Sequence, residues 1–165
     1  MRRVITGPPQ SGKSARAERL LLDVASPPIA YIATLPSTRS SSERIARHRE
    51  RRGDEWVTWE MTDAADECLG LIERALQTHE HVLIDGASIL AWRVALRDDE
   101  IDCSLAAAFL RRLSDLLLRR DGNWVVVDAM LAYPNAGTAD PFNALMQAYH
   151  QAWRALAGQD PSADE

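Results

Sequence analysis

Short apolar runs alternate along the chain with longer segments in which apolar residues recur every three or four positions. The short runs are typical of strands buried on both faces, and the longer segments are typical of amphipathic helices. The predicted strands are 4–6, 29–34, 55–60, 81–85 and 124–128. The predicted helices are 14–22, 43–52, 62–77, 89–96, 105–117 and 140–157, with Thr62 as the cap of the third and a charged loop at 97–100. This alternation favours an α/β fold with a mostly parallel sheet and helices on both of its faces.

Length and composition indicate one domain. A chain of 165 residues has the usual length of a single domain, and no linker or internal repeat divides it. We expect this domain to span 1–158 and the short polar segment 159–165 to be a disordered tail. The net charge of −5 argues against a general nucleic-acid binder. No apolar run has the length of a membrane span and no signal-peptide pattern is present, so a cytoplasmic protein is expected.

Two cysteines occur, Cys68 and Cys103, and both lie in predicted helices. They are far apart in the sequence and show no metal-ligand spacing. This pattern favours free thiols over a disulfide or a metal site.

A glycine-rich segment between the first strand and the first helix fits the phosphate-binding pattern G-x-x-x-x-G-K-[ST] at every fixed position. Its members are Gly7, Pro8, Pro9, Gln10, Ser11, Gly12, Lys13 and Ser14. Backbone N–H groups of such a loop point at a polyphosphate, the lysine adds a positive charge at the outer phosphates, and the serine hydroxyl is a ligand for Mg²⁺. A glycine-rich turn with a solvated lysine is the alternative. The order strand, loop, helix favours nucleotide binding in a three-layer α/β/α domain that is P-loop NTPase-like.

Asp85 ends the apolar strand 81–85. A carboxylate at the tip of a strand beside a phosphate loop orders Mg²⁺ in many nucleotide-binding proteins, so Asp85 is a candidate metal ligand together with Ser14. The alternative is that Asp85 caps the helix that follows. A second carboxylate, Asp128, ends the strand 124–128 in the same way.

The predicted helix 43–52 is rich in arginine although the protein is acidic. Its spacing places Arg44, Arg47, His48 and Arg51 on one stripe. The stripe either faces a phosphate-bearing ligand or belongs to a solvated helix with Glu–Arg pairs. The residues alone favour the solvated helix.

Taken in order, these motifs resemble those of a known family, the bifunctional adenosylcobinamide kinases and adenosylcobinamide-phosphate guanylyltransferases of cobalamin biosynthesis. The phosphate loop is shared with many nucleotide-binding proteins, and the basic segment with its histidine is much more diagnostic. The motifs beyond the phosphate loop are Tyr31-Ile32-Ala33-Thr34, Arg44-Ile45-x-x-His48-x-x-x-Arg52, Trp56-x-Thr58-x-Glu60 and Leu83-Ile84-Asp85.

The resemblance implies a reaction and a set of site residues. In the family, the histidine at the position of His48 attacks the α-phosphate of GTP, carries GMP covalently and passes it to adenosylcobinamide phosphate. The resemblance therefore implies that His48 and Lys13 are catalytic. The implied nucleotide-binding residues beyond the phosphate loop are Arg44, Arg47, Arg51, Arg52, Glu60 and Asp85. The implied small molecules are Mg²⁺, GTP or ATP, and a corrinoid acceptor, and a homo-oligomer is expected.

The chain departs from the family pattern near its end. The family usually has an Asn-Glu-Val-Gly-like segment after its penultimate strand, where this chain has Asp128-Ala129-Met130-Leu131-Ala132. It also usually has one more strand after the last helix. Two other classes of function stay open: a small-molecule kinase with another acceptor, and a nucleotide-binding protein without catalysis.

Overall fold

The computed structural model of the chain describes residues 1–7, 11–35, 42–98, 100–120, 122–128, 150–152 and 154–156, and it describes residues 42–44 and 47 by their backbone only. Five strands form one parallel sheet in the order β1-β7-β4-β2-β3. Their bounds are β1 Arg2–Thr6, β2 Ile29–Ala33, β3 Trp56–Glu60, β4 His81–Asp85 and β7 Asn123–Asp128. The predicted mostly parallel α/β sheet is confirmed.

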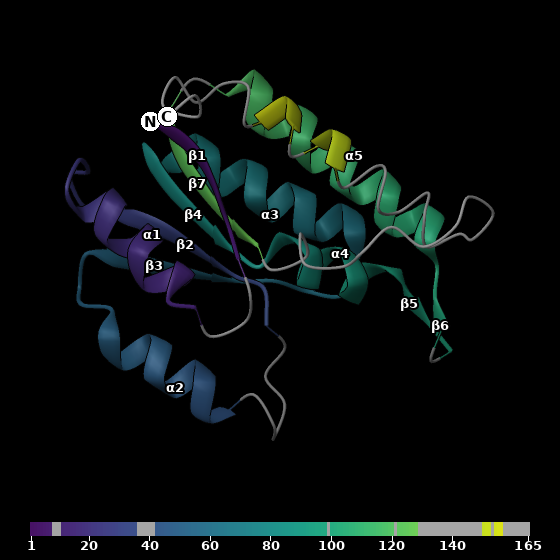
Figure 1. Cartoon of the computed structure of the whole chain (residues 1–165), viewed down its shortest axis with the longest axis horizontal. Coiled ribbons are helices and arrows are strands. Elements are labelled where there is room, and N and C mark those ends of the chain that lie inside the picture. Colours follow the sequence, from purple (N-terminus) through teal and green to yellow (C-terminus); the bar gives the residue numbers. More distant parts are fainter. Residues whose placement is uncertain are drawn as a thin grey trace.

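Helices join the parallel strands by crossing back over the sheet, as parallel pairing requires. Figure 1 shows α1 and α2 on one side of the sheet and α3, α4 and α5 on the other. Their bounds are α1 Lys13–Leu22, α2 Ser42–Arg51, α3 Ala65–Thr78, α4 Ala87–Ala95 and α5 Cys103–Arg119. The molecule therefore has the expected three layers.

Apolar side chains of the central strands pack against both layers, because successive residues of a strand point to opposite faces. In β4, Val82 and Ile84 belong to the core cluster shared with α3, α4 and α5. Leu83, between them, packs in a second cluster with Ala17 and Leu21 of α1. Burial on both faces explains why the strand sequence is an unbroken apolar run.

Two local predictions are wrong. Thr62 does not cap α3: the cap position is Ala64, in extended backbone, and the Thr62 hydroxyl accepts a hydrogen bond from the Ala64 N–H at 3.3 Å. The segment predicted as a charged loop forms a short antiparallel hairpin of β5 (Leu96–Arg97) and β6 (Glu100–Ile101). Asp98 in its turn has a φ of 47°, a left-handed conformation that aspartate tolerates better than most residues.

The predicted helix 140–157 is described only in part. Residues 150–152 and 154–156 are helical, and Ala152 and Leu156 are buried in the core. The segment 129–132 and the tail 159–165 lie outside the described residues, so a single domain over 1–158 stays a prediction. Within the described ranges no helix combines the length and the apolar character needed to cross a membrane.

The carboxyl ends of the strands gather the predicted site residues at one edge of the sheet. In the strand register, Ala33 of β2 lies beside both Asp85 of β4 and Glu60 of β3. Thr6, at the end of β1, lies beside Asp128 of β7. Ligands of open parallel sheets bind at this edge, which makes it the place to look for a site.

The turn that leaves β4 is built around Gly86. Its φ is 95°, and a Cβ added there would lie 2.8 Å from the Thr34 hydroxyl oxygen. That hydroxyl donates to the backbone oxygen of Asp85 at 2.5 Å, and the Gly86 N–H donates to the oxygen of Val127 at 2.8 Å. The turn thus connects the ends of β2, β4 and β7.

We predict that Gly86→Ala lowers the free energy of unfolding by about 1–3 kcal/mol, because alanine is strained at this φ and its methyl group collides with Thr34. Gly70, inside α3, is the matched control: a Cβ there meets no atom of the described part of the chain within 4 Å. Gly70→Ala should stabilise the protein by about 0.5–1 kcal/mol, since alanine is the better helix former. Urea unfolding of both variants measures the two effects. Effects of the same sign would contradict the account of the turn.

Candidate functional site

The phosphate loop leads into α1 at Gly12. This glycine has a φ of 83°, and a Cβ built on it would meet no atom of the described residues within 4 Å, so a ligand can approach the backbone closely on the side that they form. The first helical hydrogen bond runs from Arg16 N to Gly12 O, and neither a side-chain cap nor an acidic residue is present in the first turn. The first-turn N–H groups and the helix dipole therefore favour an anion here.

The described residues of the loop agree with that role. Gly7 directly follows β1, and Lys13 begins α1, with its Nζ 3.4 Å from the Ser11 hydroxyl oxygen. Pro8, Pro9 and Gln10 lie outside the described residues.

Asp85 links the start of α1 to the middle of the sheet. Its Oδ1 accepts a hydrogen bond from the Ser14 hydroxyl at 2.9 Å, and its Oδ2 accepts one from the Tyr31 hydroxyl at 2.5 Å. The His48 Nδ1 lies 3.4 Å from the Tyr31 oxygen and 3.6 Å from Asp85 Oδ2. The structure thus brings Ser14, His48 and Asp85 together and adds Tyr31.

The helix-cap alternative for Asp85 is wrong. The cap position of α4 is Gly86, which has no side chain. A carboxylate does stabilise the first turn of α4, but it is Asp128 from β7, which accepts from the Ser88 N–H at 2.9 Å and from the Ser88 hydroxyl at 2.5 Å. Asp85 is therefore left facing Ser14 and Tyr31.

Tyr31 is the site residue that the sequence interpretation missed. Its side chain is 3% exposed, and burial together with the negative charge of Asp85 raises the pKa of its phenol far above the ordinary value. The hydroxyl therefore keeps its proton and donates it. One signal was available: Tyr31 is the single side chain with a hydrogen-bonding group in the apolar strand 29–33, and such a buried hydroxyl needs a partner.

Arg52 covers the face of the Tyr31 ring. Its guanidinium carbon is 3.6 Å from the ring centroid, and its Nε donates to the backbone oxygen of His48 at 2.9 Å. Its Nη1 is buried and has no hydrogen-bond partner among the described residues. A buried donor without a partner is costly, so this atom is suited to an anionic ligand.

Of the predicted stripe Arg44, Arg47, His48 and Arg51, the structure describes the side chains of His48 and Arg51 only. Arg51 binds Glu18 of α1 with two hydrogen bonds of 2.6 and 2.7 Å, and this partner raises the pKa of the guanidinium. Arg49 pairs with Glu60 at 2.7 Å on the surface. The side chains of Arg44 and Arg47 lie outside the described residues. The nucleotide-binding roles of Arg44, Arg47, Arg51 and Glu60 stay predictions.

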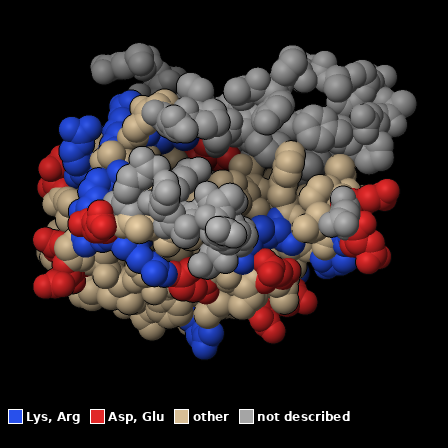
Figure 2. Space-filling model, turned by 90° about the horizontal axis from the view of Figure 1, so that it is seen from below, with Lys and Arg blue, Asp and Glu red and all other residues tan. Residues whose placement is uncertain are grey.

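A small pocket opens beside these groups. Its lining comes from the carboxyl ends of β2, β3 and β4 and from α2, and consists of Tyr31, Ala33, Thr34, Leu35, Ile45, His48, Arg49, Arg52, Glu60 and Asp85. Figure 2 views the molecule from the side on which α2 lies in Figure 1, and shows basic and acidic side chains next to one another. The pocket lining itself combines Arg49 and Arg52 with Glu60 and Asp85, so positive charge there is local, which suits a small anion more than a long polyanion.

The oxygen atoms of Ser14 and Asp85 fit a Mg²⁺ site. They lie 2.9 Å apart at the start of α1, and both are hard donors. Among the described residues no group of three His, Cys, Asp or Glu side chains could hold a metal ion by itself. Mg²⁺ is commonly held in this way, by one or two protein oxygens, with phosphate and water completing its octahedron.

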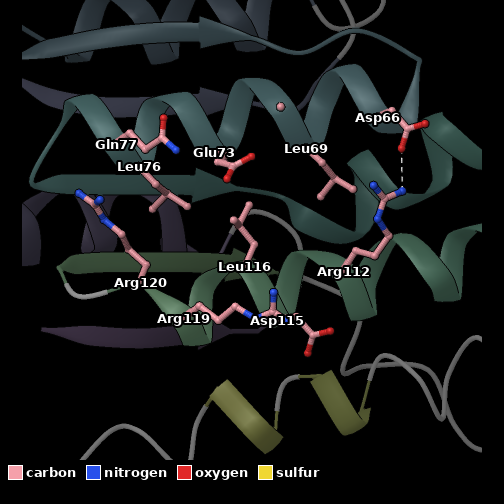
Figure 3. A pocket seen from close by; sticks show the side chains of 11 residues that line it. Asp66, Leu69, Glu73, Leu76, Gln77, Arg112, Asp115, Leu116, Arg119 and Arg120 are labelled. Atoms are coloured by element: carbon pink, nitrogen blue, oxygen red, sulfur yellow. Dashed lines mark hydrogen bonds and ion pairs between the residues drawn. The ribbon is translucent and has the colours of Figure 1, made fainter.

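A larger groove, of about 610 Å³, lies between α3 and α5 and shares no residue with the pocket. Figure 3 shows Leu69, Leu76 and Leu116 between the two helices, with charged side chains along both of them. Asp66 and Arg112 pair across the groove at 2.7 Å. The phosphate loop, Asp85 and His48 are all outside it, so size alone does not identify the functional site.

Comparisons with known proteins agree with the geometry. The family model described as cobinamide kinase / cobinamide phosphate guanyltransferase matches residues 3–156. No curated protein sequence matches the chain. A KaiC-like protein of the hyperthermophilic archaeon Pyrococcus horikoshii OT3 has a similar structure, with a TM-score of 0.54 over 88% of this chain and 68% of that one. At 13% identity this likeness shows the fold alone.

The two Arg–Glu ion pairs that the structure describes for α2 should differ in strength. Glu18 is 5% exposed, so Arg51→Ala would leave a buried carboxylate without its partner, and we expect it to cost about 1–3 kcal/mol of unfolding free energy. Arg49→Ala is the matched control, because both members of the Arg49–Glu60 pair are more than half exposed. It should cost at most about 1 kcal/mol. Urea denaturation measures both, and equal losses would refute the difference.

Proposed function

This chain belongs to the cobinamide kinase / cobinamide phosphate guanyltransferase family, and we propose that it phosphorylates adenosylcobinamide and then transfers GMP to the product through His48. The observation that carries this proposal is the position of His48. Its Nδ1 lies 3.6 Å from the carboxylate that also binds Ser14, at the start of the phosphate-loop helix. If α2 were only a solvated surface helix, nothing would require its histidine to lie beside this carboxylate.

In the guanylyl transfer, a nitrogen of the neutral His48 ring attacks the α-phosphorus of GTP. The N–P bond forms while the P–O bond to pyrophosphate breaks, and pyrophosphate leaves with the electron pair. A phosphate oxygen of adenosylcobinamide phosphate then attacks the same phosphorus, and the N–P bond breaks. Histidine suits this reaction because its neutral ring is nucleophilic near pH 7 and leaves readily from phosphorus.

Several groups are available to balance the charge of the phosphates. The first turn of α1 supplies backbone N–H groups, and Lys13 extends from the same turn. The unpartnered Nη1 of Arg52 is a further donor at the pocket. Mg²⁺, held by Ser14 and Asp85, would neutralise phosphate charge and help pyrophosphate to leave.

The kinase reaction would use the same nucleotide site. Here the substrate hydroxyl is the nucleophile and the γ-phosphate of ATP or GTP is transferred, so His48 is not needed for bond formation. A kinase with another acceptor and no guanylyl transfer is the second candidate, because the sequence departs from the family pattern after Asp128. We also propose a homo-oligomer, which the mass from light scattering would test.

We predict that the protein takes up label from α-labelled GTP and that His48→Asn takes up none. An amide can keep a hydrogen bond at this position but cannot form the N–P bond. Nucleotide affinity, measured by calorimetry, should stay close to that of the unaltered protein because the phosphate loop is intact. Transfer from γ-labelled nucleotide to adenosylcobinamide should survive. Full α-label on His48→Asn would show that this residue does not carry the guanylyl group. If the unaltered protein transferred the γ-phosphate but took up no α-label, the second candidate, a kinase without guanylyl transfer, would be favoured.

Lys13→Ala should slow both transfers by about 100- to 1000-fold, since the lysine stabilises charge that develops on the outer phosphates. Arg19→Ala is a suitable control because it removes an exposed positive charge from the last turn of the same helix. Initial rates at saturating nucleotide provide the comparison. If both variants turned over like the unaltered protein, Lys13 would have no part in the site.

A further inference from the structure

We propose that Tyr31 is a positioning residue that holds the proton of the His48 ring on Nδ1 and so makes Nε2 the attacking atom. The proposal rests on the proposed function, because it concerns the same histidine. Tyr31 begins the strand motif Tyr31-Ile32-Ala33-Thr34, but that motif by itself gives the side chain no role.

The direction of the hydrogen bonds follows from their partners. A phenol has one proton, and Tyr31 directs it to Asp85 Oδ2 at 2.5 Å, where a carboxylate is the stronger acceptor. The Tyr31 oxygen therefore presents a lone pair to His48 Nδ1, which lies 3.4 Å away. Asp85 Oδ2, 3.6 Å from Nδ1, also only accepts. Both oxygens that face Nδ1 therefore favour the tautomer in which Nδ1 carries the proton.

Rigid surroundings fix the Tyr31 hydroxyl. The residue lies in β2, between β4 and β3, and its ring meets the Trp56 ring edge to face at a centroid distance of 6.0 Å. The Arg52 guanidinium covers the ring and also bonds the backbone oxygen of His48. Arg52 therefore ties the phenol and the histidine backbone together, and a positioning hydrogen bond needs such restraint to act.

This tautomer makes the proton balance of the guanylyl transfer simple. The lone pair of Nε2 forms the bond to phosphorus, and the ring becomes a cation that still carries its Nδ1 proton. The Tyr31 oxygen and the Asp85 carboxylate face that cation and stabilise it. When the acceptor phosphate displaces the ring, the neutral Nδ1-protonated imidazole returns. No proton has to move on His48 in either half of the reaction.

Asp85 then serves two neighbours through different oxygens. Oδ1 accepts from Ser14, on the side of the phosphate loop, and Oδ2 accepts from Tyr31, on the side of His48. The Tyr31 hydroxyl contacts both Asp85 Oδ2 and His48 Nδ1, so it couples the carboxylate to the imidazole. A role for Tyr31 in packing alone would need only the ring, and phenylalanine would supply it.

Tyr31→Phe in the full chain tests the proposal, because it removes the hydroxyl and keeps the ring against Trp56 and Arg52. In single-turnover experiments with α-labelled GTP we expect guanylyl transfer to slow by about 10- to 100-fold, the range typical when the partner that orients a metal-bound histidine is lost. The GTP concentration for half-maximal rate should stay unchanged. Trp56→Phe is the matched control: it keeps an aromatic ring beside Tyr31, leaves the hydroxyl untouched and should keep the normal rate.

Nitrogen NMR of the ¹⁵N-histidine-labelled protein without nucleotide reads the tautomer directly. His48, assigned by the signal that disappears in His48→Asn, should carry its proton on Nδ1, and Tyr31→Phe should move population to the Nε2-protonated form. The guanylyl group, located by phosphorus–nitrogen coupling, should be on Nε2. An unchanged tautomer and rate in Tyr31→Phe, or a guanylyl group on Nδ1, would overturn the proposal while guanylyl transfer itself stood. If the unaltered protein took up no α-label, the proposed guanylyl transfer would be wrong. The NMR tautomer of His48 would then still show whether Tyr31 orients the ring.

Discussion

The carboxylate of Asp85 is the point on which the arrangement of the site depends. It ends β4, the central strand, so its position is fixed by pairing with β2 on one side and β7 on the other. Its backbone oxygen is held by Thr34, and its two side-chain oxygens accept from Ser14 and Tyr31. Through these contacts one residue aligns the phosphate-loop helix, the neighbouring strand and, through the Tyr31 hydroxyl, the histidine of α2. A carboxylate on a mobile loop could not set three elements at once.

The basic helix shows how an acidic protein keeps positive charge local. Arg51 is committed to the buried Glu18 of α1, and Arg49 pairs with Glu60 at the surface. These pairs dock α2 against α1 and the edge strand β3. Arg52 differs from both, because it stacks on Tyr31 and keeps a buried N–H atom without a partner among the described residues. Arg49 and Arg51 thus form ion pairs that hold α2 in place, whereas Arg52 directly follows the helix and has a donor left over for a ligand. The phosphate-binding interpretation of these arginines stays a prediction.

The sequence predicts the strands, most helices and the phosphate loop because each depends on local signals: apolar runs, helical periodicity and a fixed glycine spacing. It does not predict Tyr31 as a site residue, because the contact with Asp85 joins residues 54 positions apart and requires β2 and β4 to be neighbours. The short hairpin at 96–101 was missed for a different reason. Its strands have two residues each, too few for any alternation to show. Thr62 has the right chemistry for a helix cap, but the backbone continues extended to Ala64 and the helix starts later.

The two carboxylates that end β4 and β7 have different partners and different roles in the fold. Asp128 is 1% exposed, and its oxygens bind Ser88 at the start of α4, so it stabilises a helix and does not face the pocket. Asp85, one strand away, has the opposite arrangement: a glycine follows it, the helix takes no cap from it, and its oxygens face Ser14 and Tyr31. Because Asp128 accepts the hydrogen bonds of Ser88 at the start of α4, Asp85 is not needed to cap that helix. Asp128 thus stabilises the start of α4, and Asp85 keeps its contacts with Ser14 and Tyr31.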